Sequence, residues 1–125
     1  MKIISFAETT EALLAGRKTC TRREWTQHHA LLFHRSELVQ AYNTSPRAGG
    51  HRVGMVQLTG YPVLTRKGDN LPPEDWEGEG FAYMEEHGLT LFHGQTPRQV
   101  WEEWSQPGGT AGLWVVRFRL VNGLI

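Results

Sequence analysis

The chain has 125 residues, 39% of them hydrophobic and 21% charged, which predicts one compact domain over residues 1–125. Thirteen Lys and Arg balance thirteen Asp and Glu, so the whole molecule lacks the net positive charge that attracts nucleic acid or an anionic membrane. A single cysteine, Cys20, excludes an intrachain disulfide and a zinc module built from several cysteines. The start, MKIISFAETTE, lacks the apolar stretch of a signal peptide, and no apolar run approaches a membrane span, so we expect a soluble cytoplasmic protein.

The N-terminal part predicts a strand followed by a short helix. Residues 2–6 have the apolar character of a strand, and residues 9–15 predict a helix with Leu13 and Leu14 facing the core. Gly16 stands at the position where such a helix ends. The basic segment that follows therefore begins directly after a helix.

The rest of the chain predicts strands first and helices later. Apolar and β-branched residues predict strands at 38–42 and 53–59, between turn-forming stretches. A helix is expected over 79–87, and the N-cap, proline and capping-box glutamine of residues 96–99 predict another, ending near Trp104.

The final strand is predicted at residues 113–121. It alternates apolar residues with Arg117 and Arg119, which places both arginines on one side of a sheet. Few helices and several scattered strands favour an α+β or small barrel-like domain.

Charge is distributed unevenly along the chain. Residues 1–67 contain ten basic and four acidic residues, whereas residues 68–125 contain three basic and nine acidic residues. Two interpretations follow: the two halves attract each other within the fold, or a basic groove is gated by a carboxylate.

Several common catalytic motifs are absent from the sequence. The six histidines form no helical pair with an intervening glutamate, and we expect no metal or other cofactor. There is no dinucleotide fingerprint, phosphate-binding P-loop or nucleophile elbow. Cys20 is interpreted as a packed thiol rather than a nucleophile, because no histidine is aligned with it.

The most informative motif is GRKTCTRR at residues 16–23. Arginine forks and a lysine charge bind anionic oxygens, and threonine hydroxyls can donate to phosphate or base edges. The plainer alternative is a solvated basic loop. At this point the sequence resembles the ASCH domains of the PUA-like superfamily, whose signature of Gly-x-Lys, then Thr or Glu, then Arg corresponds to Gly16, Lys18, Thr21 and Arg23.

The resemblance continues at Glu79-Gly80-Phe81, which looks like the family's acidic residue near a helix start. It implies a PUA-like small β-barrel with flanking short helices and a cleft associated with RNA or modified nucleosides. Some small bacterial members are amidohydrolases that remove the acetyl group of N4-acetylcytidine. Their lysine, threonine and glutamate correspond to Lys18, Thr21 and Glu79 as candidate catalytic residues, with Glu77 as the competing carboxylate.

In the hydrolase interpretation, a lysine whose pKa is lowered by neighbouring arginines takes the proton of Thr21. Glu79 would orient Lys18 or transfer protons to the leaving amine. This chain differs from the short amidohydrolases by a longer segment at residues 24–37 and by the tryptophan-bearing helix, so its pocket is expected to have different walls.

A binding interpretation uses the same residues without turnover. Its candidate ligand-binding residues are Arg17, Arg22, Arg23, Trp25, Tyr42, Arg47 and Phe81, whereas Trp101 and Trp104 are expected to pack in the core. Zero net charge favours a short single strand or one nucleotide over a duplex. The leading hypothesis is therefore an RNA or nucleotide-binding domain, with amidohydrolase or ribonuclease activity as the alternative and a protein-interaction domain as a third possibility.

Overall fold

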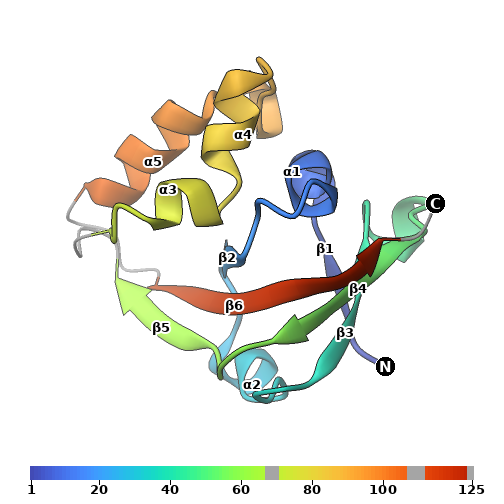
Figure 1. The fold of residues 1–125 in the computed structure, drawn as a ribbon. Helices are drawn as coiled ribbons and strands as arrows, with labels where there is room; N and C mark the ends of the chain where they lie inside the picture. Colours follow the sequence, from blue (N-terminus) through green and yellow to red (C-terminus); the bar gives the residue numbers. More distant parts are fainter. Residues whose placement is uncertain (67–70, 107–111, 124–125) are drawn as a thin grey trace.

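The fold is a mixed α+β structure in which a curled six-stranded sheet forms a half-barrel with short helices around it (Figure 1). The structure is a computed structural model, and it describes residues 1–66, 71–106 and 112–123. Within these ranges, no helix combines the length and the apolar character that crossing a membrane requires.

Strand β6 organises the sheet because it pairs with three other strands. The strands are β1 (Ile3–Ser5), β2 (Cys20–Arg23), β3 (Leu38–Tyr42), β4 (Arg52–Leu58), β5 (Val63–Arg66) and β6 (Gly112–Gly123). Their order is β1-β3-β4-β6-β2, with β5 paired to β6 beyond the end of β4. Strands β1 and β3 are parallel, and all other pairs are antiparallel. Strands β1 and β2 are thus the two ends of this path.

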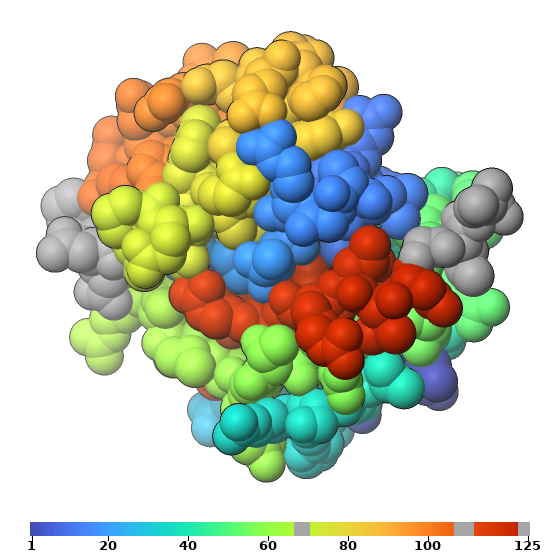
Figure 2. All heavy atoms as spheres, viewed as in Figure 1, coloured from blue at the N-terminus to red at the C-terminus, as the bar shows by residue number. Residues whose placement is uncertain are grey.

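The helices are short and most of them lie on one side of the sheet. They are α1 (Thr10–Leu14), α2 (Gln27–Ala30), α3 (Asp75–Gly78), α4 (Phe81–Glu86) and α5 (Pro97–Ser105), with 3-10 turns η1 (Ala7–Thr9), η2 (Pro46–Ala48) and η3 (Phe92–Gly94). In Figure 1, α1, α3, α4 and α5 lie above the sheet and α2 lies below it. Figure 2 shows the later helices, in yellow and orange, packed against the blue N-terminal segment above β6.

The core lies between the curled sheet and α1. Buried apolar side chains, most of them from these elements, form its main cluster: Ile4, Phe6, Leu13, Phe33, Val39, Ala41, Val53, Val56, Leu58, Val116 and Phe118. Leu13 is in this cluster, but the prediction that Leu14 also faces the core is wrong, because Leu14 is 40% exposed. Adjacent helical residues point in different directions, so this short helix buries one of them.

The predicted helix over 79–87 is shorter in the structure, where α4 covers Phe81–Glu86 and a separate helix, α3 (Asp75–Gly78), precedes it. Helix α3 ends at Gly78, Glu79 and Gly80 form the junction, and α4 begins at Phe81. Gly80 has φ of +87°, and a Cβ there would lie 2.7 Å from the Ala12 Cβ. A glycine is therefore required where the chain turns past α1, and Glu79 is held at a fixed bend rather than within a helix.

Other predictions are confirmed closely. Strand β3 matches the predicted range, and β6 contains the predicted final strand. Helix α5 has both halves of the capping box, because the Thr96 hydroxyl accepts from the Gln99 amide and the Gln99 side chain accepts from the Thr96 amide. Strands β2 and β5 and helices α2 and α3 are elements that the sequence analysis did not anticipate.

The two ends of the sheet, β1 and β2, are linked by a side chain. A guanidinium N–H of Arg23 in β2 donates to the backbone carbonyl of Ser5 in β1. The same guanidinium lies 5.8 Å from the ring centre of Phe6. We call this region between β1 and β2 the seam, and the candidate site lies along it.

Candidate functional site

A cavity of about 490 Å³ lies at the seam and collects residues from distant parts of the chain. Its lining includes Ser5, Phe6, Glu8, Thr9, Lys18, Thr21, Arg22, Arg23, Glu24, Thr44, Glu79, Phe81, Leu91, Phe92, Val100, Glu103 and Trp104. The three candidate catalytic residues, Lys18, Thr21 and Glu79, all belong to it. We call it the seam cavity.

Lys18 and Glu79 face each other across the loop that enters β2. The Lys18 amine donates to the Glu79 backbone carbonyl at 2.7 Å and lies 3.4 Å from Glu79 Oε1. Both side chains are almost fully buried. The Thr19 amide donates to the Gly78 carbonyl at 2.7 Å, which ties the start of β2 to the end of α3. The junction after α3 therefore sets the position of the carboxylate relative to the amine.

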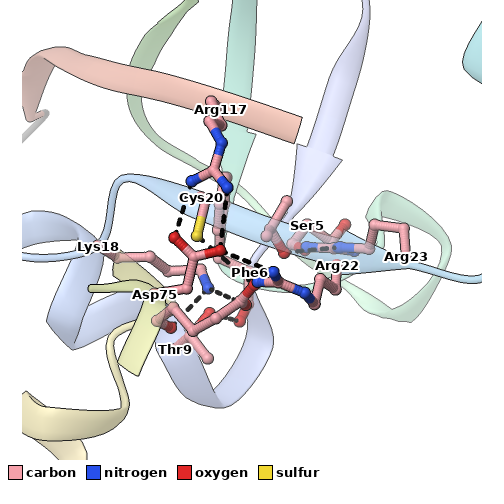
Figure 3. Close-up of polar contacts among 11 residues, drawn as sticks. Ser5, Phe6, Thr9, Lys18, Cys20, Arg22, Arg23, Asp75 and Arg117 are labelled. Atoms are coloured by element: carbon pink, nitrogen blue, oxygen red, sulfur yellow. Dashed lines mark hydrogen bonds and ion pairs between the residues drawn. The ribbon is translucent and has the colours of Figure 1, made fainter. Parts of the chain in front are cut away.

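The buried carboxylates are joined by arginines into one ionic network (Figure 3). Arg22 donates to Glu79 Oε2 at 2.6 Å and to Asp75 Oδ2 at 2.7 Å, so one guanidinium bridges two carboxylates. Arg117 on β6 donates to both oxygens of Asp75, at 2.8 and 2.9 Å. The network runs from half-exposed Arg117 through Asp75, Arg22 and Glu79 to Lys18.

The charges of this network and its burial together favour a lowered pKa for the Lys18 amine. Two arginines balance the carboxylates of Asp75 and Glu79, which leaves a protonated Lys18 as the surplus cation. Burial lowers the pKa of the Lys18 amine, and the charge of Glu79 offsets that effect only in part. A neutral amine can still donate an N–H to the Glu79 carbonyl while its lone pair accepts a proton.

Asp75 and the neighbouring Cys20 also have shifted pKa values. Burial alone would raise the pKa of Asp75, but hydrogen bonds from Arg117 and Arg22 outweigh it and lower that pKa. Burial raises the pKa of Cys20 to about 12, and its sulfur lies 3.5 Å from Glu79 Oε2. The thiol is therefore protonated near neutral pH, in agreement with the prediction of a packed cysteine.

Thr21 lies beside the seam arginine. Its hydroxyl oxygen accepts from Arg23 Nε at 3.0 Å, and its side chain lines the seam cavity while remaining only 4% exposed. Arg23 thereby fixes the threonine rotamer and places a positive charge next to its oxygen. The strand conformation of β2 points Thr21 and Arg23 to the same face because they are two residues apart.

The competing carboxylate, Glu77, lies elsewhere. Arg17 forms ion pairs with Glu77 and Glu86 at the surface, outside the lining of the seam cavity. The structure thus brings Glu79 to Lys18 and Glu77 to Arg17. These pairs join the basic N-terminal half to the acidic C-terminal half, as the first interpretation of the charge asymmetry predicted.

Three aromatic or basic candidates also lie outside the cavity lining. Trp25 stacks on Phe33 at 4.6 Å beside the core, Tyr42 lies within β3, and Arg47 is exposed in η2. Trp25 is held there by aromatic packing and does not line the seam cavity.

Besides Phe6, the aromatic residues that line the cavity come from α4, η3 and α5. Phe81 lines it and packs against Trp76, Trp101 and Trp104. Trp104 also lines the cavity, with its ring centre 5.7 Å from the Arg22 guanidinium carbon. Helix α5 therefore forms one wall, as expected from the added tryptophan-bearing helix. Sequence analysis placed Trp104 in the core and did not single out Asp75 as a site residue.

The cavity lining is not basic overall. Lys18, Arg22 and Arg23 contribute positive charge, and each has a protein partner. Four carboxylates share the lining: Glu8, Glu24, Glu79 and Glu103. A neutral ligand is thus favoured over a polyanion. Among the described residues, no three His, Cys, Asp or Glu side chains are grouped closely enough to hold a metal ion.

Comparison with known proteins supports the fold. No family model matches the sequence, and no curated protein matches it. A crystal structure of protein EF3133 from Enterococcus faecalis V583, of the family model DUF984, is similar with a TM-score of 0.59 and 14% sequence identity. The match covers 98% of this chain and 81% of that chain. The shared architecture is the mixed α+β fold with a curled six-stranded half-barrel sheet and short helices.

Proposed function

We propose that this protein hydrolyses the amide of an N-acylated nucleobase or nucleoside bound in the seam cavity. The main observation in support is that a buried lysine amine with a lowered pKa, a threonine hydroxyl and a carboxylate line one cavity. The resemblance of Lys18, Thr21 and Glu79 to the amidohydrolase residues of ASCH domains supports the same reaction. N4-acetylcytidine is the substrate with which to begin.

The proposed reaction proceeds in two steps, transfer of the acyl group to Thr21 and hydrolysis of the resulting ester. The neutral Lys18 amine takes the proton of the Thr21 hydroxyl as its oxygen attacks the amide carbon, and the C–N bond then breaks. The Lys18 ammonium returns that proton to the leaving amine. Water next attacks the acyl ester on Thr21, again losing a proton to Lys18, and releases the carboxylic acid with Thr21 restored.

Glu79 and Arg23 have supporting roles in this scheme. The Glu79 carbonyl and carboxylate hold the Lys18 amine in place through contacts of 2.7 and 3.4 Å. Arg23 donates to the Thr21 oxygen, so it stabilises negative charge that develops there during attack. These groups are positioned before substrate arrives, which is the condition for effective electrostatic catalysis.

Hydrolysis of a small neutral ligand is favoured over binding of an extended RNA strand. Phosphate recognition depends on cations that can pair with the backbone, but the three cations of the cavity already pair with protein groups. The four carboxylates of the lining would repel phosphates. Binding of RNA without turnover and cleavage of RNA are therefore treated as alternative outcomes of the experiment and are not proposed.

The decisive variants change the threonines of the β2 region. Wild type is expected to release cytidine and acetate in equal amounts from N4-acetylcytidine. Thr21→Ala should lower kcat/KM by about 10³-fold because the nucleophile is lost, whereas Thr21→Ser should retain most of it. Thr19→Ala serves as the matched control, since Thr19 is exposed and outside the cavity lining.

Two results would contradict this proposal in different ways. Full activity in Thr21→Ala would mean that water attacks the substrate directly and that no acyl ester forms. No turnover by folded wild-type protein would reject the amidohydrolase and direct attention to RNA binding, measured with a short single-stranded oligonucleotide.

The network also predicts a shift in pH dependence. Activity should rise with pH as Lys18 becomes neutral. Arg117→Gln removes one positive charge from the network and leaves its carboxylates in excess, so the pKa of Lys18 should rise and the rising limb should move to higher pH. Arg119→Gln is the control, because Arg119 lies on the same side of β6 but bonds to Gln57 instead.

This shift has a readout that does not depend on turnover. The chain contains three lysines, Lys2, Lys18 and Lys67, so carbon-13 labelling at lysine Cε should give three resonances whose titration reports each amine. The Lys18 resonance should titrate at higher pH in Arg117→Gln than in Arg119→Gln. An unchanged titration would show that Arg117 has only a structural role.

A further inference from the structure

The seam cavity has two chemically different sides that meet at the ionic network. One side, from β1, η1 and neighbouring loops, presents hydroxyls and carboxylates from Ser5, Glu8, Thr9, Glu24 and Thr44. The other, from the α4–α5 connection and α5, presents mainly apolar groups, from Leu91, Phe92, Val100 and Trp104, together with the polar side chains of Gln95 and Glu103. We call them the polar side and the apolar side.

The apolar side begins directly beside the reacting groups. The Trp104 ring lies 5.7 Å from the Arg22 guanidinium carbon, and Arg22 donates to Glu79 at 2.6 Å. Trp104 is also stacked at a tilt on Phe81, with ring centres 5.4 Å apart. Thr21 lines the same cavity, so an acyl group that it attacks shares that cavity with this apolar surface. Leu91, Val100 and Trp104 are each half-buried, so this wall retains surface that a ligand can cover.

We infer that the apolar side is an acyl subsite, which makes the preferred substrates amides with acyl groups longer than acetyl. This inference rests on the proposed amidohydrolase function and specifies its substrate class. The polar side then takes the nucleoside, because ribose hydroxyls can donate to carboxylates and exchange hydrogen bonds with Ser5, Thr9 and Thr44. A hydrocarbon chain gains nothing from that side, whereas on the apolar side it leaves water.

The size of the expected effect follows from the burial of methylene groups. Each buried methylene contributes about 0.8 kcal/mol, which corresponds to about a fourfold increase in kcat/KM. Along the series N4-acetyl-, N4-propionyl- and N4-butyrylcytidine, kcat/KM should therefore rise about fourfold at each step while the acyl chain stays inside the cavity. A site shaped for acetyl alone would give the opposite order.

A variant in the wall tests where the acyl chain lies. Val100→Phe adds bulk to the apolar side, so it should lower kcat/KM for the butyryl substrate at least fivefold more than for the acetyl substrate. Glu102→Phe is the matched control, because Glu102 is exposed on the same helix and outside the lining. It should leave the whole series unchanged.

The outcomes separate this inference from the function on which it rests. Turnover of the acetyl substrate with no gain for longer chains, or equal effects of Val100→Phe on all chains, would overturn the acyl subsite and leave the hydrolase in place. If no amide is hydrolysed, the dissociation constants of the same three compounds are measured by calorimetry. A fourfold tightening at each step would retain the subsite, and a flat series would overturn it.

Discussion

Replacing Lys18 by methionine is expected to remove most of the catalysis at only a small cost in stability. General base catalysis contributes about 10²–10⁴-fold to rate, so kcat/KM should fall by about 10³-fold. Methionine has a similar length and keeps the buried volume filled, and the Glu79 carboxylate keeps its bond to Arg22. The cost of the lost hydrogen bond is about 1 kcal/mol.

The effect on stability should depend on pH in a defined direction. The pKa of Lys18 is lowered in the folded protein from its ordinary value of 10.5, so between the two values the unfolded chain binds a proton that the folded chain does not. Wild-type stability therefore falls as the pH drops through this window, and Lys18→Met removes that contribution. The melting temperature of Lys18→Met relative to that of wild type should therefore rise as the pH is lowered from 10 to 7.

The control for this variant is Lys2→Met, which removes a partly exposed lysine paired with Glu37. It should retain full turnover and lack the pH-dependent gain, which thermal unfolding at both pH values measures. If Lys18→Met instead unfolds and Lys2→Met does not, the lysine holds the fold together. In that case the loss of turnover in Lys18→Met no longer supports a catalytic role for Lys18.

The strands and helices that the sequence predicted are those stabilised by local patterns. Strand β3 has the apolar run of a core strand, and α5 has a complete capping box. Strand β2 has the sequence CTRR, with no apolar pattern, and its Arg22 is buried because Asp75 and Glu79 pair with it. Those partners are more than 50 residues away, so local sequence holds no signal for them.

The residues of the candidate site also divide into those that local motifs located and those that depend on partners far away in the sequence. The resemblance at residues 16–23 located Lys18, Thr21 and Arg23, and the element at 79–81 located the carboxylate. Asp75 carried no motif of its own within an acidic stretch, although the structure makes it the link between Arg22 and Arg117. Pairing of a particular carboxylate with a particular arginine depends on how α3 packs on β2 and β6, and that packing is not encoded locally.

Neutralising Glu79 should destabilise the fold far more than neutralising its neighbour Glu77. Glu79→Gln leaves Arg22 buried with one carboxylate partner in place of two, and breaking a buried pair in this way costs about 3–5 kcal/mol. Glu77 is paired with Arg17 at the surface and its side chain is 48% exposed, so Glu77→Gln should change stability by about 0.5 kcal/mol or less. Urea unfolding of both variants measures the difference.

A second substitution makes the argument independent of how well Glu79→Gln folds. Once the carboxylate is gone, the cost lies in the uncompensated charge of Arg22, whose side chain is 2% exposed. Adding Arg22→Met removes that charge and leaves Asp75 paired with Arg117, so the double variant should be more stable than Glu79→Gln alone. Additive losses in this cycle would mean that Arg22 and Glu79 contribute separately, and that the network does not hold the charge balance on which a neutral Lys18 depends.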